Sequence, residues 1–190
     1  MMFLLPLSAQ SSPRDAQFGI DLKGKPVSTL AGPGTRVIVL IFAASDCPIS
    51  NRYVPEIARL SKEFSGSDAS HPAARLWWVF PNPGDSAAVV AQHQREFDIH
   101  EDMALDPQQL LVRRARATTT PEAAVFAIRG ADLDEVYRGR IDDRYLSLGQ
   151  ERPQAIHHDL EDAIRAALAD RPVPQPGGPP VGCSIAFLQK

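Results

Sequence analysis

The sequence has few cysteines, and their number and spacing limit its chemistry. Only two of the 190 residues are cysteine, Cys47 and Cys183. Two thiols are too few for a small fold held together by several disulfides. Without a Cys-x-x-Cys pair or a closely spaced cysteine and histidine, they do not form a zinc site by themselves. We therefore expect neither a bound metal ion nor a cofactor.

Long apolar runs and basic stripes are also missing. Nothing in the chain approaches the length of a membrane span, so we expect no integral membrane segment. The formal net charge is −3, with acidic and basic residues interspersed, which argues against a nucleic-acid partner. Hydrophobic residues make up 44% and charged residues 23%, a composition typical of a globular protein with a substantial core.

Residues 1–17 begin with a short apolar run that ends in small side chains. The run resembles the second half of a secretory signal, but the positively charged start of such a signal is missing. Two interpretations stay open: a partial signal peptide of a periplasmic or secreted protein, or a flexible terminus of a cytoplasmic one. The remaining chain divides into one domain over residues 18–170 and a Pro/Gly-rich tail over residues 171–190 that carries Cys183.

Hydrophobic periodicity predicts alternating strands and helices, followed by a hairpin and a last helix. Apolar runs of strand length fit strands buried on both faces, and side chains at helical spacing fit amphipathic helices. The expected strands cover residues 36–42, 75–80, 103–105, 123–128 and 135–141, and the expected helices start at Ser50 (with a kink at Pro55), after Asp85 or Ser86, at Pro107 and at His157. This order predicts an α/β fold with a mixed central sheet flanked by helices.

The first of these strands leads directly to Cys47, at the start of a helix. Ligands bind at the carboxyl ends of strands in open α/β sheets. Unpaired backbone N–H groups and the helix dipole at a helix N-terminus favour a thiolate, so we expect a lowered pKa for Cys47. Pro48 suits the first helical turn. Asp46 would oppose the thiolate by like charge, unless it points outward and caps the helix.

The segment from Phe42 to Ser50, with its Cys47-Pro48 pair, is followed by a helix and later by Thr120-Pro121 before a strand. This arrangement resembles the thioredoxin-like superfamily, and within it most closely the redoxin and alkyl-hydroperoxide-reductase/thiol-specific-antioxidant branch. The resemblance covers residues 18–169. It implies a thioredoxin-like fold, Cys47 as the attacking thiol, and a cis proline at Pro121, next to Thr120, that packs against this cysteine.

The chain departs from the family pattern at three places. The position of the second cysteine of the usual dithiol motif is Ser50, so Cys47 has no local disulfide partner. Leu40 and Ala44 stand where the peroxidase motif has proline and threonine. The candidates for the arginine of the peroxidase site are Arg138, Arg140 and Arg144.

Cys183 is the candidate replacement for the missing partner, because its Pro/Gly tether is long enough to wrap back. A resolving cysteine on a C-terminal tail is an arrangement that occurs in the wider family. The apolar residues that follow Cys183 suggest a tail that docks on the domain. A structural disulfide and a free tail thiol without a role are the alternatives at this position.

Together these features predict a thiol–disulfide oxidoreductase of redoxin type, with a weak peroxidase activity as an extension. Its substrate would be a disulfide or peroxide, of a protein or a small molecule, and a partner protein would reduce it. Two alternatives stay open. One is a copper(I)-binding or assembly protein that uses Cys47, Cys183 and a histidine as ligands. The other is a redox-inert interaction domain of the same fold.

Overall fold

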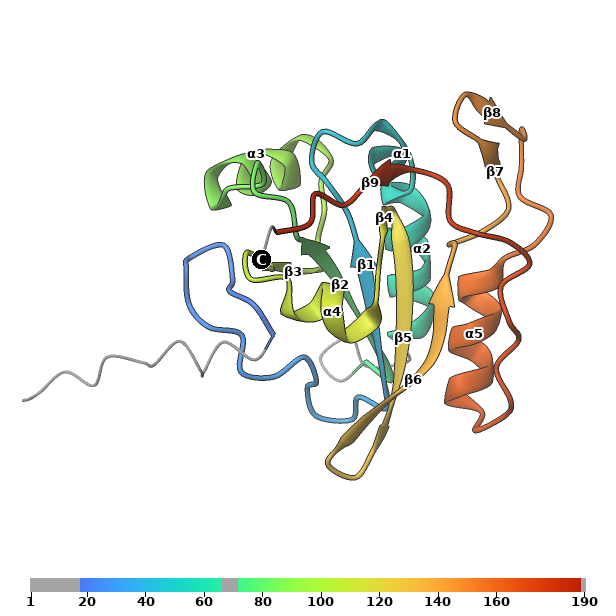
Figure 1. The fold of residues 1–190 in the computed structure, drawn as a ribbon. Coiled ribbons are helices and arrows are strands. Elements are labelled where there is room, and N and C mark those ends of the chain that lie inside the picture. The colour runs from blue at the N-terminus through green and yellow to red at the C-terminus, as the bar shows by residue number, and fades with distance from the viewer. Residues whose placement is uncertain (1–17, 66–71, 189–190) are drawn as a thin grey trace, which may run out of the picture.

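The computed structural model describes residues 18–65 and 72–188, so the N-terminal run interpreted as a partial signal lies outside the described residues. Its centre is a five-stranded sheet in the order β3-β2-β1-β5-β6 (Figure 1). β1, β2 and β3 are parallel, whereas β5 is antiparallel to both β1 and β6. This mixed sheet with flanking helices confirms the expected fold class.

The elements follow the predicted order with a few additions. In chain order they are β1 (Val37–Phe42), α1 (Pro48–Arg52), α2 (Val54–Phe64), β2 (Ala74–Phe80), α3 (Ala87–Glu96), β3 (Asp102–Leu105), α4 (Leu110–Ala115), β4 (Thr119–Thr120), β5 (Glu122–Arg129), β6 (Asp132–Gly139), β7 (Tyr145–Ser147), β8 (Gln150–Glu151), α5 (Asp159–Leu168) and β9 (Cys183–Ser184). β4 pairs with β9, and β7 pairs with β8, in two small sheets outside the main one.

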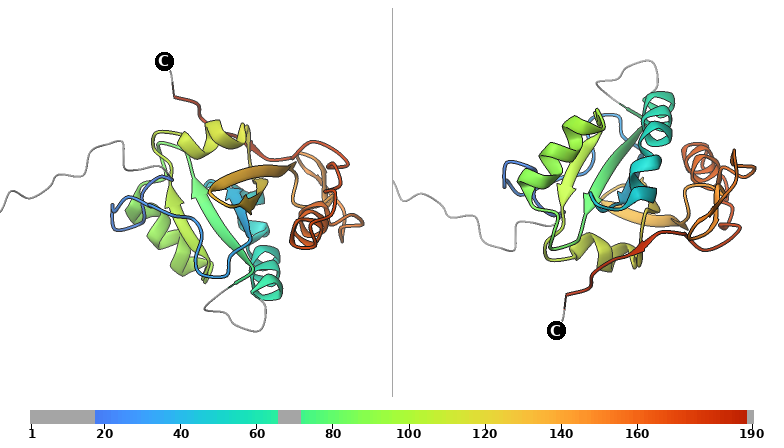
Figure 2. Two further views of the ribbon diagram at one scale, coloured as in Figure 1. Left: turned by 90° about the horizontal axis from the view of Figure 1, so that it is seen from below. Right: turned by 90° about the horizontal axis from the view of Figure 1, so that it is seen from above.

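β1 is buried on both faces, so its alternate side chains enter two different cores. Val39 and Ile41 pack in a cluster with apolar residues of α2, α3 and α5. Leu40 and Phe42 pack in a second cluster with residues of α4 and with Ile185 from the tail. The helices thus cover both faces of the sheet (Figure 2), and the tail contributes to the core of one face.

The long helix expected from Ser50 is two helices. α1 ends at Arg52 and α2 begins at Val54, with Tyr53 between them. Pro55 lies in the first turn of α2, where a missing backbone N–H removes no helical hydrogen bond. The prediction of one helix with a kink at Pro55 is therefore wrong, because the helix is interrupted at Tyr53, two residues before the proline.

The helix expected from Pro107 begins only at Leu110. The buried carboxylate of Asp106 accepts hydrogen bonds from the backbone N–H groups of Leu110, Leu111 and Val112 at 2.7, 2.9 and 3.0 Å. These bonds satisfy the unpaired donors of the helix start. Gln109, just before α4, has a φ of +52°, so it lies outside the helix.

The tail returns to the domain after α5. It runs from α5 past the edge of the sheet at which β1 ends and reaches β9, which lies beside β4 (Figure 1). Within the described residues, no helix has both the length and the apolar character needed to span a membrane.

Candidate functional site

Cys47 lies at the carboxyl end of β1, in the N-cap position of α1. Its backbone carbonyl accepts a hydrogen bond from the N–H of Asn51 at 3.1 Å, which begins the helix. Its side chain is completely buried. The thiol donates a hydrogen bond to the backbone carbonyl of Thr120, with 3.1 Å between Sγ and O. The nucleophile expected from the sequence is thus held in contact with the Thr120-Pro121 turn.

The Thr120–Pro121 peptide bond is cis. The turn before it is held by the buried side chain of Glu122, whose role no sequence pattern indicates. One carboxylate oxygen of Glu122 accepts hydrogen bonds from the backbone N–H groups of Thr118 and Thr119 at 2.8 and 3.2 Å. The other lies 3.4 Å from the guanidinium of Arg138. Glu122 thereby fixes the backbone segment that contacts the Cys47 thiol.

Cys183 reaches the same turn from the tail. In the antiparallel pair of β9 and β4, Cys183 stands opposite Thr120 and Ser184 opposite Thr119. The Thr120 hydroxyl donates to the carbonyl of Cys183 at 3.4 Å, and the N–H of Ile185 donates to the carbonyl of Thr118 at 3.0 Å. Both cysteines are free thiols in the structure. The strand pairing brings together two residues that the sequence separates widely.

Burial alone would raise the pKa of Cys47, but Cys183 and Ser50, which can donate hydrogen bonds to its thiolate, outweigh burial and lower that pKa. The lowered pKa has the direction expected from the sequence, although the tail cysteine contributes as well as the helix start. The pKa of Cys183 is raised to about 11, by burial first and then by the sulfur of Cys47 and the charge of Asp46. The pKa values of the two thiols are therefore shifted in opposite directions.

The other expected site residues lie around this pair. Pro48 is exposed and occupies the first turn of α1. Asp46 is exposed and does not cap α1, because Cys47 takes the N-cap position and no side chain caps the helix. Ser50 is buried, and its hydroxyl has no partner among the described residues while Cys47 is a thiol. This hydroxyl is free to donate to the sulfur once Cys47 ionises, in agreement with its effect on the Cys47 pKa.

A polar network that the sequence did not reveal supports the loop between β1 and α1. The buried carboxylate of Asp85 accepts hydrogen bonds from the backbone N–H and the hydroxyl of Ser45. Asn51 donates to the carbonyl of Ser45 at 3.3 Å, and its side-chain oxygen lies 2.8 Å from Nε2 of His93. The sequence indicated Asp85 only as a candidate residue at the start of the helix. The helix cap of α3 is Ser86.

The three candidate arginines for a peroxidase site make other contacts. Arg138 bonds Glu122, and Arg140 forms an ion pair with Asp159 at 2.8 Å. The backbone N–H of Arg144 donates to Asp142, and its Nε is buried without a partner within the described part of the chain. Among the contacts of residues 18–65 and 72–188, none joins these arginines to either cysteine.

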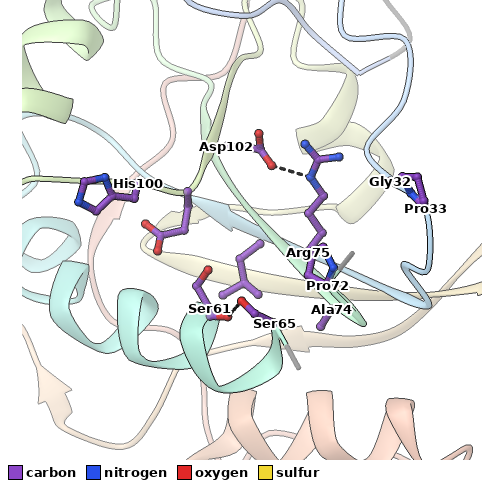
Figure 3. A pocket seen from close by; sticks show the side chains of 11 residues that line it. Gly32, Pro33, Ser61, Ser65, Pro72, Ala74, Arg75, His100 and Asp102 are labelled. Carbon is purple, nitrogen blue, oxygen red and sulfur yellow. Dashed lines mark hydrogen bonds and ion pairs between the residues drawn. The ribbon is translucent and has the colours of Figure 1, made fainter. Parts of the chain in front are cut away.

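A cavity of about 270 Å³ lies at the end of the sheet where β2 and β3 begin, opposite the end that carries the thiols (Figure 3). It is lined by residues at the starts of β2 and β3, among them Arg75, whose Nε bonds Asp102 at 2.6 Å. Because β1 and β2 are parallel and Cys47 follows the end of β1, this cavity lies away from the thiols. It has no contact with the site residues named above.

The part of the chain that the structure describes has one group of three side chains spaced to hold a metal ion: Glu56, His158 and Glu161. Both glutamates are already paired with Arg59, so this group belongs to a surface ion-pair network. The group contains neither cysteine. The expected alternative of a copper site built from both cysteines and a histidine therefore has no three-ligand arrangement in the described residues.

No family model matches the sequence, and no curated protein does. The solved structures that resemble this one include an uncharacterized conserved protein from Geobacillus kaustophilus (22% identity, TM-score 0.70, covering 90% of this chain and 88% of that one). They also include a secreted Mycobacterium tuberculosis disulfide oxidoreductase homologous to E. coli DsbE (16% identity, TM-score 0.50, covering 84% and 99%). A third is a thiol-disulfide oxidoreductase from Bacteroides fragilis (15% identity, TM-score 0.50, covering 62% and 82%).

At these identities the likeness concerns the fold. The chain has the thioredoxin-like fold that the Cys47-Pro48 and Thr120-Pro121 pairs led us to expect, and it shares this fold with disulfide oxidoreductases. What the site can do depends on its own residues. Those residues are one buried thiol with a lowered pKa and a second thiol held beside it.

Proposed function

We propose that this protein is a thiol–disulfide oxidoreductase in which Cys47 is the attacking thiol and Cys183 is the resolving thiol. One observation carries the proposal. β9 pairs with the turn that contacts Cys47, so the tail places a second thiol beside the first, and this neighbour lowers the pKa of Cys47. A thiolate is the nucleophile in disulfide exchange, and a nearby second thiol is what converts a mixed disulfide into an internal one.

The exchange proceeds in two displacements. The Cys47 thiolate attacks one sulfur of the substrate disulfide, and the other sulfur leaves with the electron pair and takes up a proton. The Cys183 thiolate then attacks the Cys47 sulfur, which releases the second substrate thiol and leaves a Cys47–Cys183 disulfide. The substrate has gained two electrons, and a reducing partner protein returns two electrons to the pair.

The pKa of Cys183 fits this order of events. It is raised to about 11 by burial, by the Cys47 sulfur and by Asp46, so Cys183 stays protonated while Cys47 carries the charge. In the mixed disulfide Cys47 is neutral and the charge next to Cys183 is gone. Cys183 then loses its proton more easily, at the step in which it must attack.

A peroxide is the second substrate class to consider. Attack of the Cys47 thiolate on a peroxide oxygen breaks the O–O bond and gives a sulfenic acid and water or an alcohol, and Cys183 condenses with the sulfenic acid, releasing water. Leu40 and Ala44 stand where the peroxidase motif has proline and threonine. We therefore propose disulfide exchange as the main activity and peroxide reduction as a weak one.

We also propose that the protein works in an oxidising compartment, where a disulfide between its two cysteines would persist. The apolar start of the sequence supports export, and one of the solved structures with this fold is of a secreted oxidoreductase.

The proposal is tested with the two serine variants and a disulfide substrate. Cys47→Ser should abolish turnover, because the alcohol is not ionised at neutral pH. Cys183→Ser should accumulate the mixed disulfide with Cys47, detectable by intact mass. Turnover that survives in Cys47→Ser would overturn the assignment. Stoichiometric copper(I) binding that either variant loses would support the copper alternative instead, and an ordinary Cys47 pKa would support the interaction domain.

A further inference from the structure

The last described segment of the chain lies extended along a row of residues that contact its main chain, and we call this row the groove. β4 holds one end, through the Cys183–Thr120 pairing and the bond from the Ile185 N–H to Thr118. Beyond β9, the side chains of Asn82 and Gln109 hold the other end. The groove thus extends from the Thr118–Thr120 edge to the loops that follow β2 and β3.

Asn82 and Gln109 contact only backbone atoms of the tail. The side-chain oxygen of Asn82 accepts from the N–H of Ala186 at 2.9 Å. Gln109 donates to the carbonyl of Ala186 at 2.7 Å and accepts from the N–H of Leu188 at 3.0 Å. Gln109 is buried and has a positive φ, so the fold places its amide at this position. Contacts of this kind would hold any extended segment, whatever its side chains.

Two positions of the segment are selective. A Cβ on Gly182 would lie 2.0 Å from the Thr120 oxygen and 3.1 Å from Cδ of Pro121, so only glycine fits there. Ile185 is buried in the core next to α4. Ser184 and Ala186 are exposed and free to vary. Around the cysteine, the groove therefore selects the pattern Gly-Cys-x-aliphatic.

The segment also stands between Cys47 and a substrate, because Cys47 is completely buried with Cys183 against it. The tail has a second, separate contact with the domain earlier in the sequence, where the N–H of Gly177 donates a hydrogen bond to Asp159 at 2.8 Å. A chain gains at most about 3.5 Å per residue. While Gly177 stays bound, the segment after it can leave the groove, but Cys183 stays close enough to return.

We propose that the polypeptide substrates of this site carry the pattern Gly-Cys-x-aliphatic, which the groove selects in the chain's own tail. The inference rests on the proposed function and adds a sequence preference for its substrates. The substrate segment takes the place of Gly182–Ile185, and its cysteine forms the mixed disulfide with Cys47. Return of the tail then brings Cys183 to that sulfur and displaces the substrate.

The test uses the full-length Cys183→Ser protein and a peptide with the sequence of residues 180–188, Pro-Val-Gly-Cys-Ser-Ile-Ala-Phe-Leu. The peptide cysteine carries a 2-thiopyridyl group. Attack of the Cys47 thiolate on the peptide sulfur breaks the S–S bond, and thiopyridone leaves with the electron pair and absorbs light. Matched peptides have alanine in place of the glycine or aspartate in place of the isoleucine. We expect the parent peptide to react about tenfold faster than either one.

Two substitutions in the protein test the groove independently of the substitutions in the peptide. Gln109→Ala, added to Cys183→Ser, should leave the discrimination between the peptides in place, because the two backbone contacts that it removes do not depend on the side chains of the segment. Gly182→Ala, added to Cys183→Ser, should accelerate the reaction of the parent peptide, because the chain's own segment no longer fits against Thr120.

A small 2-thiopyridyl disulfide without a peptide separates the two hypotheses. If it reacts with Cys47 while all three peptides react at one rate, the substrate inference is overturned and the proposed function stands. If neither the small disulfide nor the peptides react, the proposed function itself fails. If the oxidised wild-type protein contains Cys47–Cys183 disulfides between two chains, the natural occupant is the tail of a second copy, and the inference is again overturned.

Discussion

Cys183 stands directly opposite Thr120 in the β4–β9 pair, although the two residues are far apart in the sequence. The carbonyl of the same Thr120 accepts the hydrogen bond of the Cys47 thiol. One backbone unit therefore positions both sulfurs, and the tail is part of the site.

The tail cysteine should control the ionisation of Cys47. Cys183→Ala removes a hydrogen-bond donor that lowers the pKa of Cys47, so this pKa should rise and the thiolate should form only at higher pH. Cys183→Ser is the matched control, since its hydroxyl can still donate and should retain part of the effect. Ultraviolet absorbance of the thiolate, followed against pH, measures both. Identical profiles for wild type and Cys183→Ala would exclude the role of Cys183.

The residue at position 50 should determine which cysteine forms a disulfide with Cys47. Ser50→Cys places a thiol in the first turn of α1 at the position of the usual dithiol motif, and should divert the disulfide of Cys47 from Cys183 to position 50. Ser50→Ala is the control: it should leave the bond to Cys183 intact while raising the pKa of Cys47, because a donor to its sulfur is lost. Mass analysis of peptides from the oxidised proteins identifies each bond. Exclusive pairing with Cys183 in Ser50→Cys would contradict the prediction.

The parts of the site that the sequence predicts are those with local signals. The apolar run of β1, the Cys47-Pro48 pair and the Thr120-Pro121 pair each act within a few residues, so the fold, the helix start and the direction of the Cys47 pKa shift could be expected. The break before Pro55 depends on a choice between a kinked helix and two helices, which tertiary packing decides.

The contacts that complete the site join residues that are far apart along the chain. Nothing in the sequence around Gln109 indicates that its amide binds Ala186, and nothing in Gly182 indicates that Thr120 excludes a side chain there. Asp46 was expected to act on Cys47 or to cap the helix, but its charge contributes to the raised pKa of Cys183. Such effects depend on how the tail wraps back, and periodicity does not encode that path.

Glu122 should stabilise the fold through the turn that it holds. Glu122→Gln keeps the size of the side chain but weakens the charge-assisted bonds to the N–H groups of Thr118 and Thr119. Loss of such bonds in a buried place costs about 1–3 kcal/mol, which urea unfolding can measure. Glu151→Gln is the control: its pair with Arg52 is exposed to solvent, so the unfolding midpoint should hardly move. Equal midpoints for wild type and Glu122→Gln would show that the turn does not need the carboxylate.

His93 should make the fold sensitive to mild acid. Burial lowers the pKa of His93 from its ordinary value of 6.5. The negative charges of Asp85 and Glu96 raise this pKa, but burial has the larger effect. The folded state therefore binds a proton less readily than the unfolded state. The contribution of His93 to the stability of the fold is therefore complete at a pH above the pKa of histidine in the unfolded state. It declines as the pH falls through that pKa toward the lower pKa of the folded state.

Burial raises the pKa of the neighbouring Asp85 above its ordinary value of 3.8, so the folded state takes up a proton at Asp85 more readily than the unfolded state as the pH falls. The contribution of Asp85 to the pH dependence of stability therefore has the opposite sign to that of His93, and it is the same in wild type and in a variant at position 93 that retains Asp85. The test for His93 is urea unfolding between about pH 7.5 and about pH 5.5, the range around the ordinary histidine pKa. His93→Gln should lose less stability than wild type over this range, because the glutamine does not titrate. His100→Gln, at a side chain 79% exposed, should decline in parallel with wild type. If His93→Gln also declines in parallel, the acid sensitivity arises elsewhere, and the network of Asn51 and His93 is only a packing contact.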